Sequence, residues 1–519
     1  MHNRFLVGFI FFYLFIVVPT TFANSTKSAS TKLDFKKYSI TAPFKVSLPI
    51  IPLDLVNGES SSDELVLIGV DKLNQTWLAV YIFNDKSDEF ILLDKLVISD
   101  EYFAFDVSED RKGLYFLAKD KVVVLTYNSE LKADSNLKSG LYFEHKQEIS
   151  SIFLLPNSKF ISKKDFIQDV NKDGYDDIVL PDFGKTNLWL FSEDDVVPVY
   201  QHLAIKTQIE LERGGVKFTP TTLFFADFNL DNRQDVAWIS KGYINYFSQN
   251  NDGKFSITAD KIALADTIYG VNWWHIKEAD GENLDQSNLV HRAVEEIKDI
   301  NGDGLSDVVV RFTQSSGVLD RTNDYEFYLG YINQENQLAY PTIPNTVIKA
   351  EGTLTDLKII DVNKDEKFEV LVSSFELSVS NIIGALLSGG IDQNVLLFAL
   401  DDENRYEEDA LISKEVELNF SLTSGQSGQP IVRLSDVNGD GLQDLVLSSG
   451  EDRFAIFLGD QSSKLFERKS KKFKAVLPEN GELFEQYDIN HDGKEDFIIR
   501  YGRLDDESLA NKVTILMVK

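Results

Sequence analysis

The chain contains no cysteine among its 519 residues. This absence excludes disulfides, thiolate metal sites and lipid attachment through a cysteine. Exported animal proteins usually carry disulfides, so a cysteine-free exported chain fits a bacterial periplasm or exterior better.

Positive charge is also scarce: the chain has 52 Lys and Arg residues but 83 Asp and Glu residues, which gives a net charge of −31. Such a surface repels nucleic acids and anionic membranes, so neither is an expected partner. The composition does not indicate disorder, because 43% of the residues are hydrophobic and 37 of them are Phe.

Long apolar runs are limited to the N-terminus, where Phe5 to Val18 follows the basic segment Met1 to Arg4. These fourteen residues are short against the roughly 20 that a membrane-spanning helix needs. A small-residue site ending at Ala23 follows. We therefore predict a signal peptide over 1–23 and a flexible leader over 24–37, with no membrane insertion of the mature chain.

Catalytic motifs are lacking as well. The six histidines form no HExxH pair, and there is no GxSxG elbow and no P-loop. We expect no enzyme, and the sequence assigns no catalytic or cofactor-binding residue. The two carboxylates of a glycoside-cleaving site are recognised by their distance in the folded protein, which the sequence does not give. A polysaccharide-cleaving enzyme on the same scaffold therefore stays as a second alternative.

What the chain does contain is a nine-residue pattern, D-x-N-x-D-G-x-x-D. It recurs six times, at Asp169, Asp227, Asp299, Asp361, Asp436 and Asp488. The successive starts are 58, 72, 62, 75 and 52 residues apart. Several fixed polar positions recurring in this way indicate an internal structural repeat.

The spacing within the pattern suits Ca²⁺, a hard cation that takes six to eight oxygens at roughly 2.3–2.6 Å. Side chains at positions 1, 3 and 5 of a tight loop converge, position 7 adds its carbonyl, and the acid at position 9 closes the shell. Glycine at position 6 permits a left-handed backbone.

We expect about six structural calcium ions. The predicted ligands are Asp169, Asn171, Asp173, Tyr175, Asp177; Asp227, Asn229, Asp231, Arg233, Asp235; Asp299, Asn301, Asp303, Leu305, Asp307; Asp361, Asn363, Asp365, Lys367, Glu369; Asp436, Asn438, Asp440, Leu442, Asp444; and Asp488, Asn490, Asp492, Lys494, Asp496.

The loops differ among themselves. Those at Asp299 and Asp436 match the pattern fully and have a second glycine at position 4. The loop at Asp361 carries Glu366 where a left-handed backbone disfavours a side chain, and a longer acid, Glu369, at position 9. We predict that this loop binds metal most weakly.

An EF-hand would need an acid at position 12 and a following helix. Position 12 is apolar in every copy: Leu180, Trp238, Val310, Val372, Leu447 and Ile499. The ninth residue instead opens a short β-rich run such as DIVL from Asp177, and strand-like residues precede each loop. The predicted metal loop therefore joins two strands of a sheet.

Further short strands follow each loop, so a unit of about 60 residues with four strands reads as one propeller blade. Over about residues 160–519 the chain resembles the FG-GAP/VCBS repeat of the integrin α-chain propeller and of many bacterial exported proteins. The resemblance implies an all-β fold, a β-propeller with calcium in its loops.

Two weaker copies, at Asp54 and Asp106, bring the count to eight. We predict a single propeller over 38–519 with eight four-stranded blades, seven being the alternative. The last repeat ends after Lys512 to Lys519 and lacks a strand. We expect Tyr38 to Ile50 to supply it and thus to close the ring.

These features predict an exported, monomeric scaffold or adhesion-type protein with an unknown protein or glycan ligand. A carbohydrate-binding propeller is the alternative. Trp273 and Trp274, on a long spacer, either stack on a sugar or cap the core. The apolar segment 381–391 either plugs one end of the propeller or contacts a partner.

Overall fold

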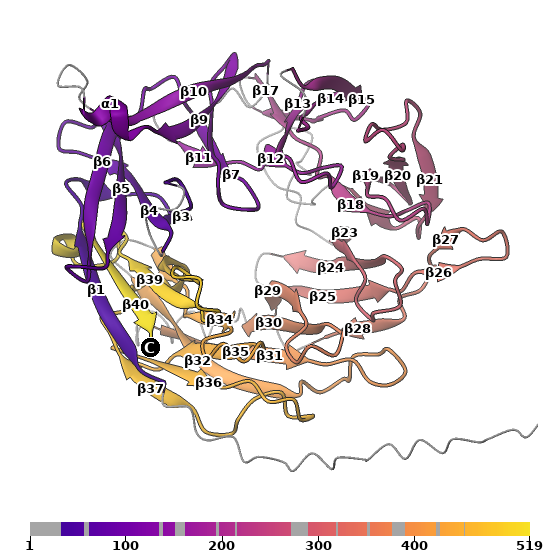
Figure 1. The fold of residues 1–519 in the computed structure, drawn as a ribbon. Helices are drawn as coiled ribbons and strands as arrows, with labels where there is room; N and C mark the ends of the chain where they lie inside the picture. Colours follow the sequence, from indigo (N-terminus) through magenta and orange to yellow (C-terminus); the bar gives the residue numbers. More distant parts are fainter. Residues whose placement is uncertain are drawn as a thin grey trace, which may run out of the picture.

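The computed structural model describes residues 33–56, 62–133, 139–150, 161–193, 197–212, 215–270, 289–317, 320–349, 353–375, 390–421, 426–450 and 452–519. In this part of the chain, strands follow one another as separate sheets around a ring, a β-propeller (Figure 1). Helical structure here is limited to α1 (Ser129–Ala133) and the short 3₁₀ turns η2 (Gly481–Leu483) and η3 (Glu507–Leu509).

The described strands form eight blades, the predicted number. The first four are β2 (Lys45–Val46), β3 (Ile51–Leu53), β4 (Glu64–Val70), β5 (Thr76–Asn84) and β6 (Glu89–Val97); β7 (Ala104–Val107), β8 (Leu114–Leu117), β9 (Lys121–Tyr127) and β10 (Leu141–Glu148); β12 (Ile167–Gln168), β13 (Asp177–Pro181), β14 (Thr186–Leu190) and β15 (Val199–Leu203); and β18 (Phe224–Ala226), β19 (Asp235–Ser240), β20 (Tyr243–Phe247) and β21 (Asp260–Ala263).

The other four blades are β23 (Leu289–Lys298), β24 (Asp307–Gly317), β25 (Asp320–Tyr328) and β28 (Thr346–Ile348); β29 (Thr353–Ile360), β30 (Glu369–Phe375), β31 (Gly390–Phe398) and β32 (Ile412–Ser421); β34 (Val432–Ser435), β35 (Asp444–Ser448), β36 (Arg453–Phe457) and β37 (Lys471–Lys474); and β38 (Phe484–Tyr487), β39 (Asp496–Arg500), β40 (Lys512–Val518) and β1 (Phe35–Thr41). The fifth and sixth blades share one ten-stranded sheet, because β29 also pairs with β25.

Short additional strands extend or connect the blades. They are β11 (Ser162–Lys163), β16 (Gln208–Glu212), β17 (Gly215–Thr219), β22 (Ile268–Tyr269), β26 (Tyr331–Ile332), β27 (Leu338–Ala339) and β33 (Gln426–Gly428).

The predicted strand boundaries at the loops are confirmed. In all six repeats the first strand ends at the residue before position 1, and the next strand begins at position 9. In the third blade, for example, β12 ends at Gln168 and β13 begins at Asp177. The nine-residue pattern therefore fixes both ends of a strand pair.

The ring closes by pairing its two ends, as predicted. Strand β1 runs antiparallel to β40 from Phe35 opposite Val518 to Thr41 opposite Lys512. In Figure 1 the indigo β1 lies beside the yellow β40. The pairing segment differs from the predicted 38–50 in two ways. It begins at Phe35, three residues earlier, and after Thr41 the chain crosses to the first blade, where β2 pairs with β4.

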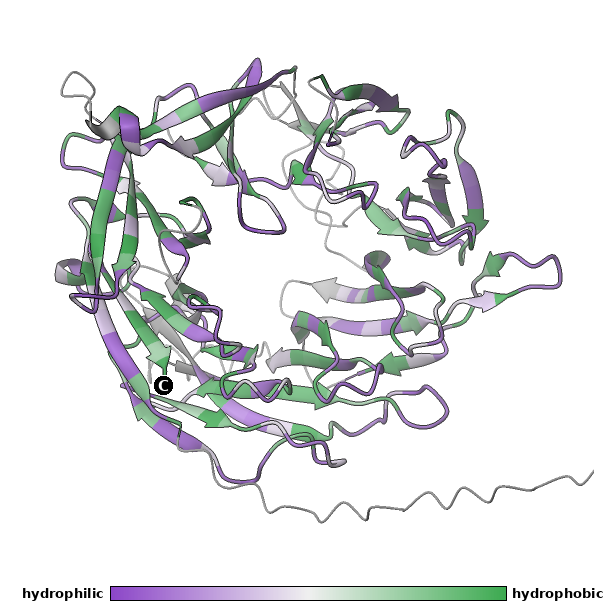
Figure 2. Cartoon of the chain, viewed as in Figure 1, coloured by the Kyte–Doolittle hydropathy of each residue, from purple (hydrophilic) through white to green (hydrophobic). Residues whose placement is uncertain are grey.

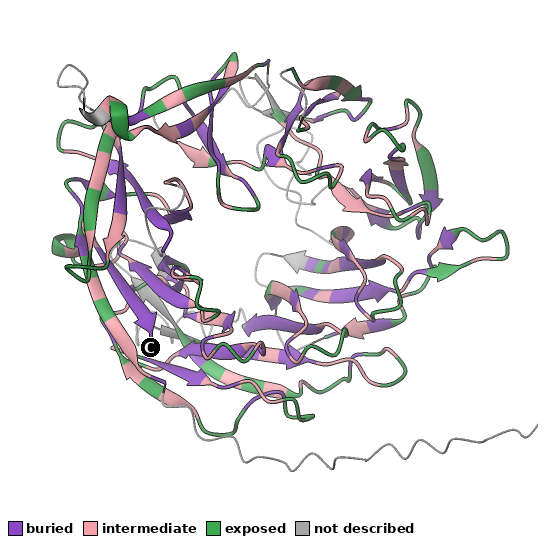
Figure 3. Ribbon diagram, viewed as in Figure 1, coloured by how far each residue is buried: buried purple, intermediate pink, exposed green. Residues whose placement is uncertain are grey.

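The core lies between neighbouring blades. Phe35 contacts the rings of Phe454, Phe473 and Phe497 at centroid distances of 4.8–5.8 Å, so the closing strand is anchored in the interface between the seventh and eighth blades. Hydrophobic residues follow the strands, and connecting loops are largely hydrophilic (Figure 2). Outer strands such as β6 are mostly exposed, whereas β4 is almost wholly buried (Figure 3).

No helix in the described ranges is both long and apolar enough to cross a membrane. The predicted signal peptide (1–23), the Trp273–Trp274 pair and residues 381–389 of the apolar segment lie outside the described residues. Leu33, inside the predicted leader, is buried in the core between the last two blades, so the propeller begins before residue 38.

Closure gives a test of the fold. Ile40 is 2% exposed and lies opposite Val513 across the closing pair. We expect Ile40→Ala to lower the free energy of unfolding by about 2–5 kcal/mol, because it removes buried methyl groups and leaves a cavity. Urea unfolding measures this. The control, Thr41→Ala on the same strand, should change it by less than about 1 kcal/mol, because Thr41 is exposed. Equal effects of the two substitutions would contradict the closure.

Candidate metal loops

The six loops share one backbone conformation. Positions 4 and 6 are both left-handed, with φ between 55° and 91° in every copy. Only position 6 was predicted, because position 4 is glycine in only two loops. Lys364 (φ 61°) and Glu366 (φ 67°) place two non-glycine residues in this conformation within the loop at Asp361. The loop at Asp227 also has two, Leu230 and Asn232, but asparagine tolerates the left-handed conformation. A left-handed side chain otherwise costs roughly 1–2 kcal/mol, so the loop at Asp361 is the most strained of the six.

The side chains at positions 1, 3 and 5 turn into the loop. The position 1 carboxylate accepts the N–H of position 6 at 2.7–3.0 Å in all six copies. The position 5 carboxylate accepts the N–H of position 7 at 2.9–3.0 Å. The position 3 amide oxygen accepts the N–H of position 5 at 2.9–3.3 Å. Their oxygens therefore gather around one turn of backbone.

The acid at position 9 has a second role that sequence reasoning missed. It is at most 2% exposed in all six repeats and accepts the N–H of position 2 at 2.8–3.4 Å. In the five repeats with aspartate, the other oxygen accepts an N–H at or just beyond the end of the third strand at 2.7–2.9 Å, as with Phe191 for Asp177. This carboxylate thus ties the loop to the body of its blade.

Burial raises the pKa of these position 9 acids. The pKa reaches about 8 for Asp177, about 6 for Asp235 and about 7 for Asp307, Glu369, Asp444 and Asp496. The hydrogen bonds to N–H groups lower these pKa values, whereas the carboxylates at positions 1 and 5 raise them further. Three carboxylates in each loop therefore repel one another electrostatically.

The donors in each loop match calcium chemistry. Positions 1 and 5 supply carboxylates, position 3 an amide oxygen and position 7 a carbonyl, all of them hard oxygen ligands. No group of three or more His, Asp or Glu side chains arranged to hold a metal occurs among the described residues. The physical reason is that the position 9 acid points inward. Each carboxylate oxygen has a second lone pair, so its hydrogen bonds leave acceptor capacity. The metal role of the thirty residues stays a prediction.

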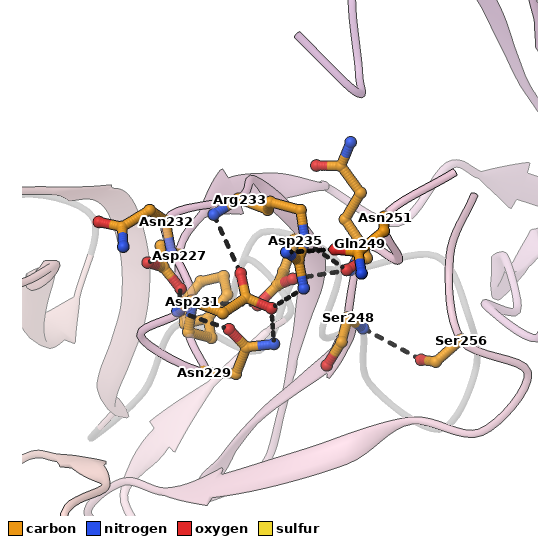
Figure 4. A network of polar contacts seen from close by, with 11 residues as sticks. Asp227, Asn229, Asp231, Asn232, Arg233, Asp235, Ser248, Gln249, Asn251 and Ser256 are labelled. Carbon is orange, nitrogen blue, oxygen red and sulfur yellow. Dashed lines mark hydrogen bonds and ion pairs between the residues drawn. The ribbon is translucent and has the colours of Figure 1, made fainter. Parts of the chain in front are cut away.

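Position 7 introduces a difference between loops. In the loop at Asp227, the Arg233 guanidinium donates to Asp231 Oδ2 and to the carbonyl of Gln249 (2.9 Å), so the chain places its own cation over a predicted ligand (Figure 4). Lys494 Nζ lies 3.4 Å from Asp492 in the last loop. The loops at Asp299 and Asp436 have leucine at position 7 and therefore no competing cation from that residue.

The loops contact one another around the ring. Position 8 of one loop donates its backbone N–H to the carbonyl of position 1 or 2 of the preceding loop: Phe368 to Ile300, Gln443 to Val362 and Glu495 to Asp436, at 2.9–3.0 Å. The approach is close, since a Cβ on Gly302 would lie 2.7 Å from the Glu366 carbonyl oxygen. In each blade the loop joins the same two strands, so the loops lie on one face of the propeller.

The weak copy at Asp54 completes this chain of contacts. Asp63 donates its N–H to the carbonyl of Ile489 in the last loop at 2.9 Å. Glu64 accepts the N–H groups of Leu55 (2.9 Å) and Val56 (3.0 Å) and so replaces the position 9 acid. Glu64 opens the strand ELVLIGV as the position 9 acid opens its strand, and this was the signal in the sequence, which the longer spacing hid.

The other weak copy, at Asp106, ends in Leu114 rather than in an acid. Here Asp106 Oδ2 accepts the N–H groups of Phe166 (2.7 Å) and Ile167 (2.8 Å), which belong to the next blade. The first aspartate of this copy therefore links two blades.

Comparisons with known proteins establish no family. No family model matches the chain, and no curated protein matches it. Solved propellers align over most of the chain at low similarity. A lectin from Agrocybe aegerita that recognises non-reducing terminal N-acetylglucosamine is 12% identical and covers 82% of this chain and 94% of its own, with a TM-score of 0.35. The Nup133 propeller of Vanderwaltozyma polyspora is also 12% identical and covers 85% and 97%, with a TM-score of 0.37. The WD40 domain of SCAP from fission yeast is 11% identical and covers 93% and 98%, with a TM-score of 0.33.

The raised pKa values of the position 9 acids predict an unusual pH dependence of the free energy of unfolding when a calcium chelator is present. An unfolded aspartate ionises near pH 4, whereas these folded groups ionise nearer pH 7. Between these values the folded state binds more protons. The free energy of unfolding should therefore fall as the pH rises from about 4 to 7, by up to about 1.4 kcal/mol per unit of pKa shift for each group.

Urea unfolding at a series of pH values in chelator measures this slope. Asp444→Asn removes one titrating carboxyl and should make the slope shallower, whereas Asp440→Asn at the exposed position 5 should change it less, because Asp440 only adds to the raised pKa of Asp444. Stability that rises over this range in chelator would contradict the assignment.

Proposed function

We propose that the chain is an exported, calcium-binding propeller of the FG-GAP/VCBS type that serves as a binding scaffold. One observation carries the proposal: six loops of the same geometry, rich in oxygen ligands, lie on one face, and the last four are linked in succession by backbone hydrogen bonds. A ring built this way suits a rigid platform, and the lack of catalytic motifs favours binding over catalysis.

In this proposal the residues at positions 1, 3 and 5 and the carbonyl at position 7 would hold the ion, with the position 9 acid beneath them. Calcium, when bound, supplies the positive charge that offsets the repulsion among the three carboxylates of a loop. The position 9 acid meanwhile holds the loop to its blade, so ordering of the loop is transmitted to the sheet. Links between loops spread this ordering around the ring.

The remaining elements of the proposal follow from sequence. A signal peptide over 1–23, predicted from the sequence, would direct the protein to the periplasm or out of the cell, where we propose that it acts as a monomer with a protein or glycan ligand. The net charge of −31 argues against nucleic acids as partners.

Calcium should stabilise the protein strongly. A ligand that binds only the folded state contributes about 2.7 kcal/mol per site at 100-fold saturation, so six sites could contribute on the order of 10 kcal/mol. We expect a much higher melting temperature in millimolar calcium than in EDTA at pH 7, and about six calcium ions in the dialysed protein. Equal melting temperatures, or at most one bound calcium, would refute the proposal.

The same experiment ranks the loops. Asp303→Ala or Asp440→Ala should lower the melting temperature in calcium more than Asp365→Ala does, because the strained loop at Asp361 has less binding energy to lose. In EDTA these differences should shrink. If Asp365→Ala proves the most damaging in calcium, the ranking is wrong.

The carbohydrate-binding alternative is favoured by one exposed aromatic site. Tyr200 is 49% exposed, and its hydroxyl donates to Asn187 Oδ1 (2.8 Å) while Lys185 Nζ donates to it (3.1 Å). It lines a groove of about 310 Å³ with Trp189 and Asp182. A fixed ring beside an amide and a carboxylate suits the apolar face and the hydroxyl groups of a sugar.

A glycan array with and without calcium tests this alternative. Tyr200→Ala should abolish binding of any glycan that the wild type retains, and the control Tyr243→Ala, which removes a tyrosine of similar exposure (45%), should not. Retention of glycan binding by Tyr200→Ala would exclude the groove.

A further inference from the structure

A second candidate site lies away from the exposed loop residues, between the sixth and seventh blades. A cavity of about 180 Å³ is enclosed there by residues of β29, β30, β31 and β34 and by Glu482 of η2. An apolar cavity of about 150 Å³ accommodates benzene, so this one is large enough for a single six-membered ring. Its lining combines apolar and polar side chains, and three features of that lining indicate what it holds.

The first feature is an uneven distribution of charge on the inner strands. The residue three places before the first loop aspartate is ionisable in four consecutive blades: Glu296, Lys358, Arg433 and Glu485. In the other four blades it is apolar: Ile51, Phe103, Phe166 and Phe224. The two cations of this set, Lys358 and Arg433, both line the cavity.

The second feature is that no carboxylate is bonded directly to either of these two cations, although Glu485 and Glu482 act on Arg433 at longer range. Lys358 Nζ donates to the carbonyl of Val432 at 3.1 Å, and Arg433 donates to the carbonyls of Val432, Gly481 and Phe484 at 2.9–3.0 Å. Within the described part of the chain neither cation forms an ion pair. An ammonium has three N–H donors and a guanidinium five, so each retains two donors. Both cations are partly buried, and burial lowers the pKa of Lys358 to about 8, so their spare donors favour an anionic acceptor.

The third feature is an unsatisfied acceptor. Gln393, on β31, lines the cavity, is 2% exposed, and its Oε1 has no hydrogen-bond partner in the described structure. Leaving a buried acceptor unpaired is costly, so a donor is expected in the cavity. Ser373, 3% exposed, adds a hydroxyl to the same wall.

The rim limits the charge of the ligand. Asp356 and Glu482 line the cavity and are exposed, so they mark the side open to solvent. Two carboxylates at the entrance repel polyanions, whereas the two cations inside attract one anionic group. A neutral sugar would give the spare N–H donors of the two cations no anionic acceptor.

We propose that this cavity binds a monoanionic, hydroxylated six-membered ring, chemically a sugar acid of the hexuronic class. Its carboxylate meets Lys358 and Arg433, and a ring hydroxyl donates to Gln393 Oε1. This cavity site does not depend on calcium in the loops. The cavity proposal and the proposed function can therefore fail independently of each other.

Calorimetric titration and thermal shift of the full chain test the proposal, with D-galacturonate and D-glucuronate as probes. We expect either uronate to bind and raise the melting temperature, and D-galactose, D-glucose, acetate and inorganic phosphate to bind at least tenfold more weakly. Phosphate bound as tightly as the uronates would overturn the assignment of a ring. The absence of any shift at millimolar uronate would overturn the site, leaving a cavity filled by water.

Substitutions of residues that line the cavity test whether the uronate binds there. Lys358→Met should weaken uronate binding at least tenfold, and so should Ser373→Leu, which keeps every charge but fills the cavity. Lys298→Met is the matched control, because Lys298 also bridges blades by donating to the carbonyl of Ile359 (3.4 Å) but does not line the cavity. Should Lys358→Met fail to fold, Ser373→Leu decides alone. Unchanged uronate binding in the folded variants would contradict the proposal.

Discussion

The buried carboxylate at position 9 is the interaction on which each repeat depends. It receives the N–H of the second loop residue, and in five repeats also an N–H from the end of the third strand. One side chain therefore fixes the loop, the start of the second strand and the end of the third. Because the group is buried and lies near two other carboxylates, its position is costly unless the surrounding charge is balanced.

From this interaction the ring follows in steps. The carboxylate orients the loop, and the loop presents its position 8 N–H and its position 1 or 2 carbonyl to the neighbouring loops. Blades are thus joined through loop backbone on one face and through hydrophobic packing between sheets. At the seam, β1 pairs with β40, and Asp63 donates to Ile489, so both kinds of contact are present where the chain ends meet.

Much of this was accessible from the sequence, because the loop pattern sets strand boundaries directly. Asp177 opens β13 and Asp496 opens β39, and eight loop positions gave eight blades. The left-handed backbone at Leu230 or His491 was not accessible, since no residue type there signals it. Blade-to-blade links were also hidden, because they are made by backbone groups that every residue except proline carries. The partnering of Arg233 with Asp231 depends on a side-chain path across the loop, which spacing alone does not define.

The cavity between the sixth and seventh blades was hidden for a related reason. Lys358, Gln393 and Arg433 are widely separated in sequence and meet only because consecutive blades pack face to face. Charged residues on an inner strand look like exceptions in a repeat whose other copies have phenylalanine or isoleucine at that position. In the fold these exceptions fall in consecutive blades, and two of them, Lys358 and Arg433, line one cavity.

A crystal structure from calcium-containing solution, with calcium located by anomalous scattering, tests the central claim most directly. The account predicts an ion in each intact loop, within roughly 2.3–2.6 Å of oxygens from positions 1, 3, 5 and 7, with the loops at Asp299 and Asp436 the most fully occupied. Loops that hold only water, with their carboxylates bonded to backbone N–H groups alone, would contradict it.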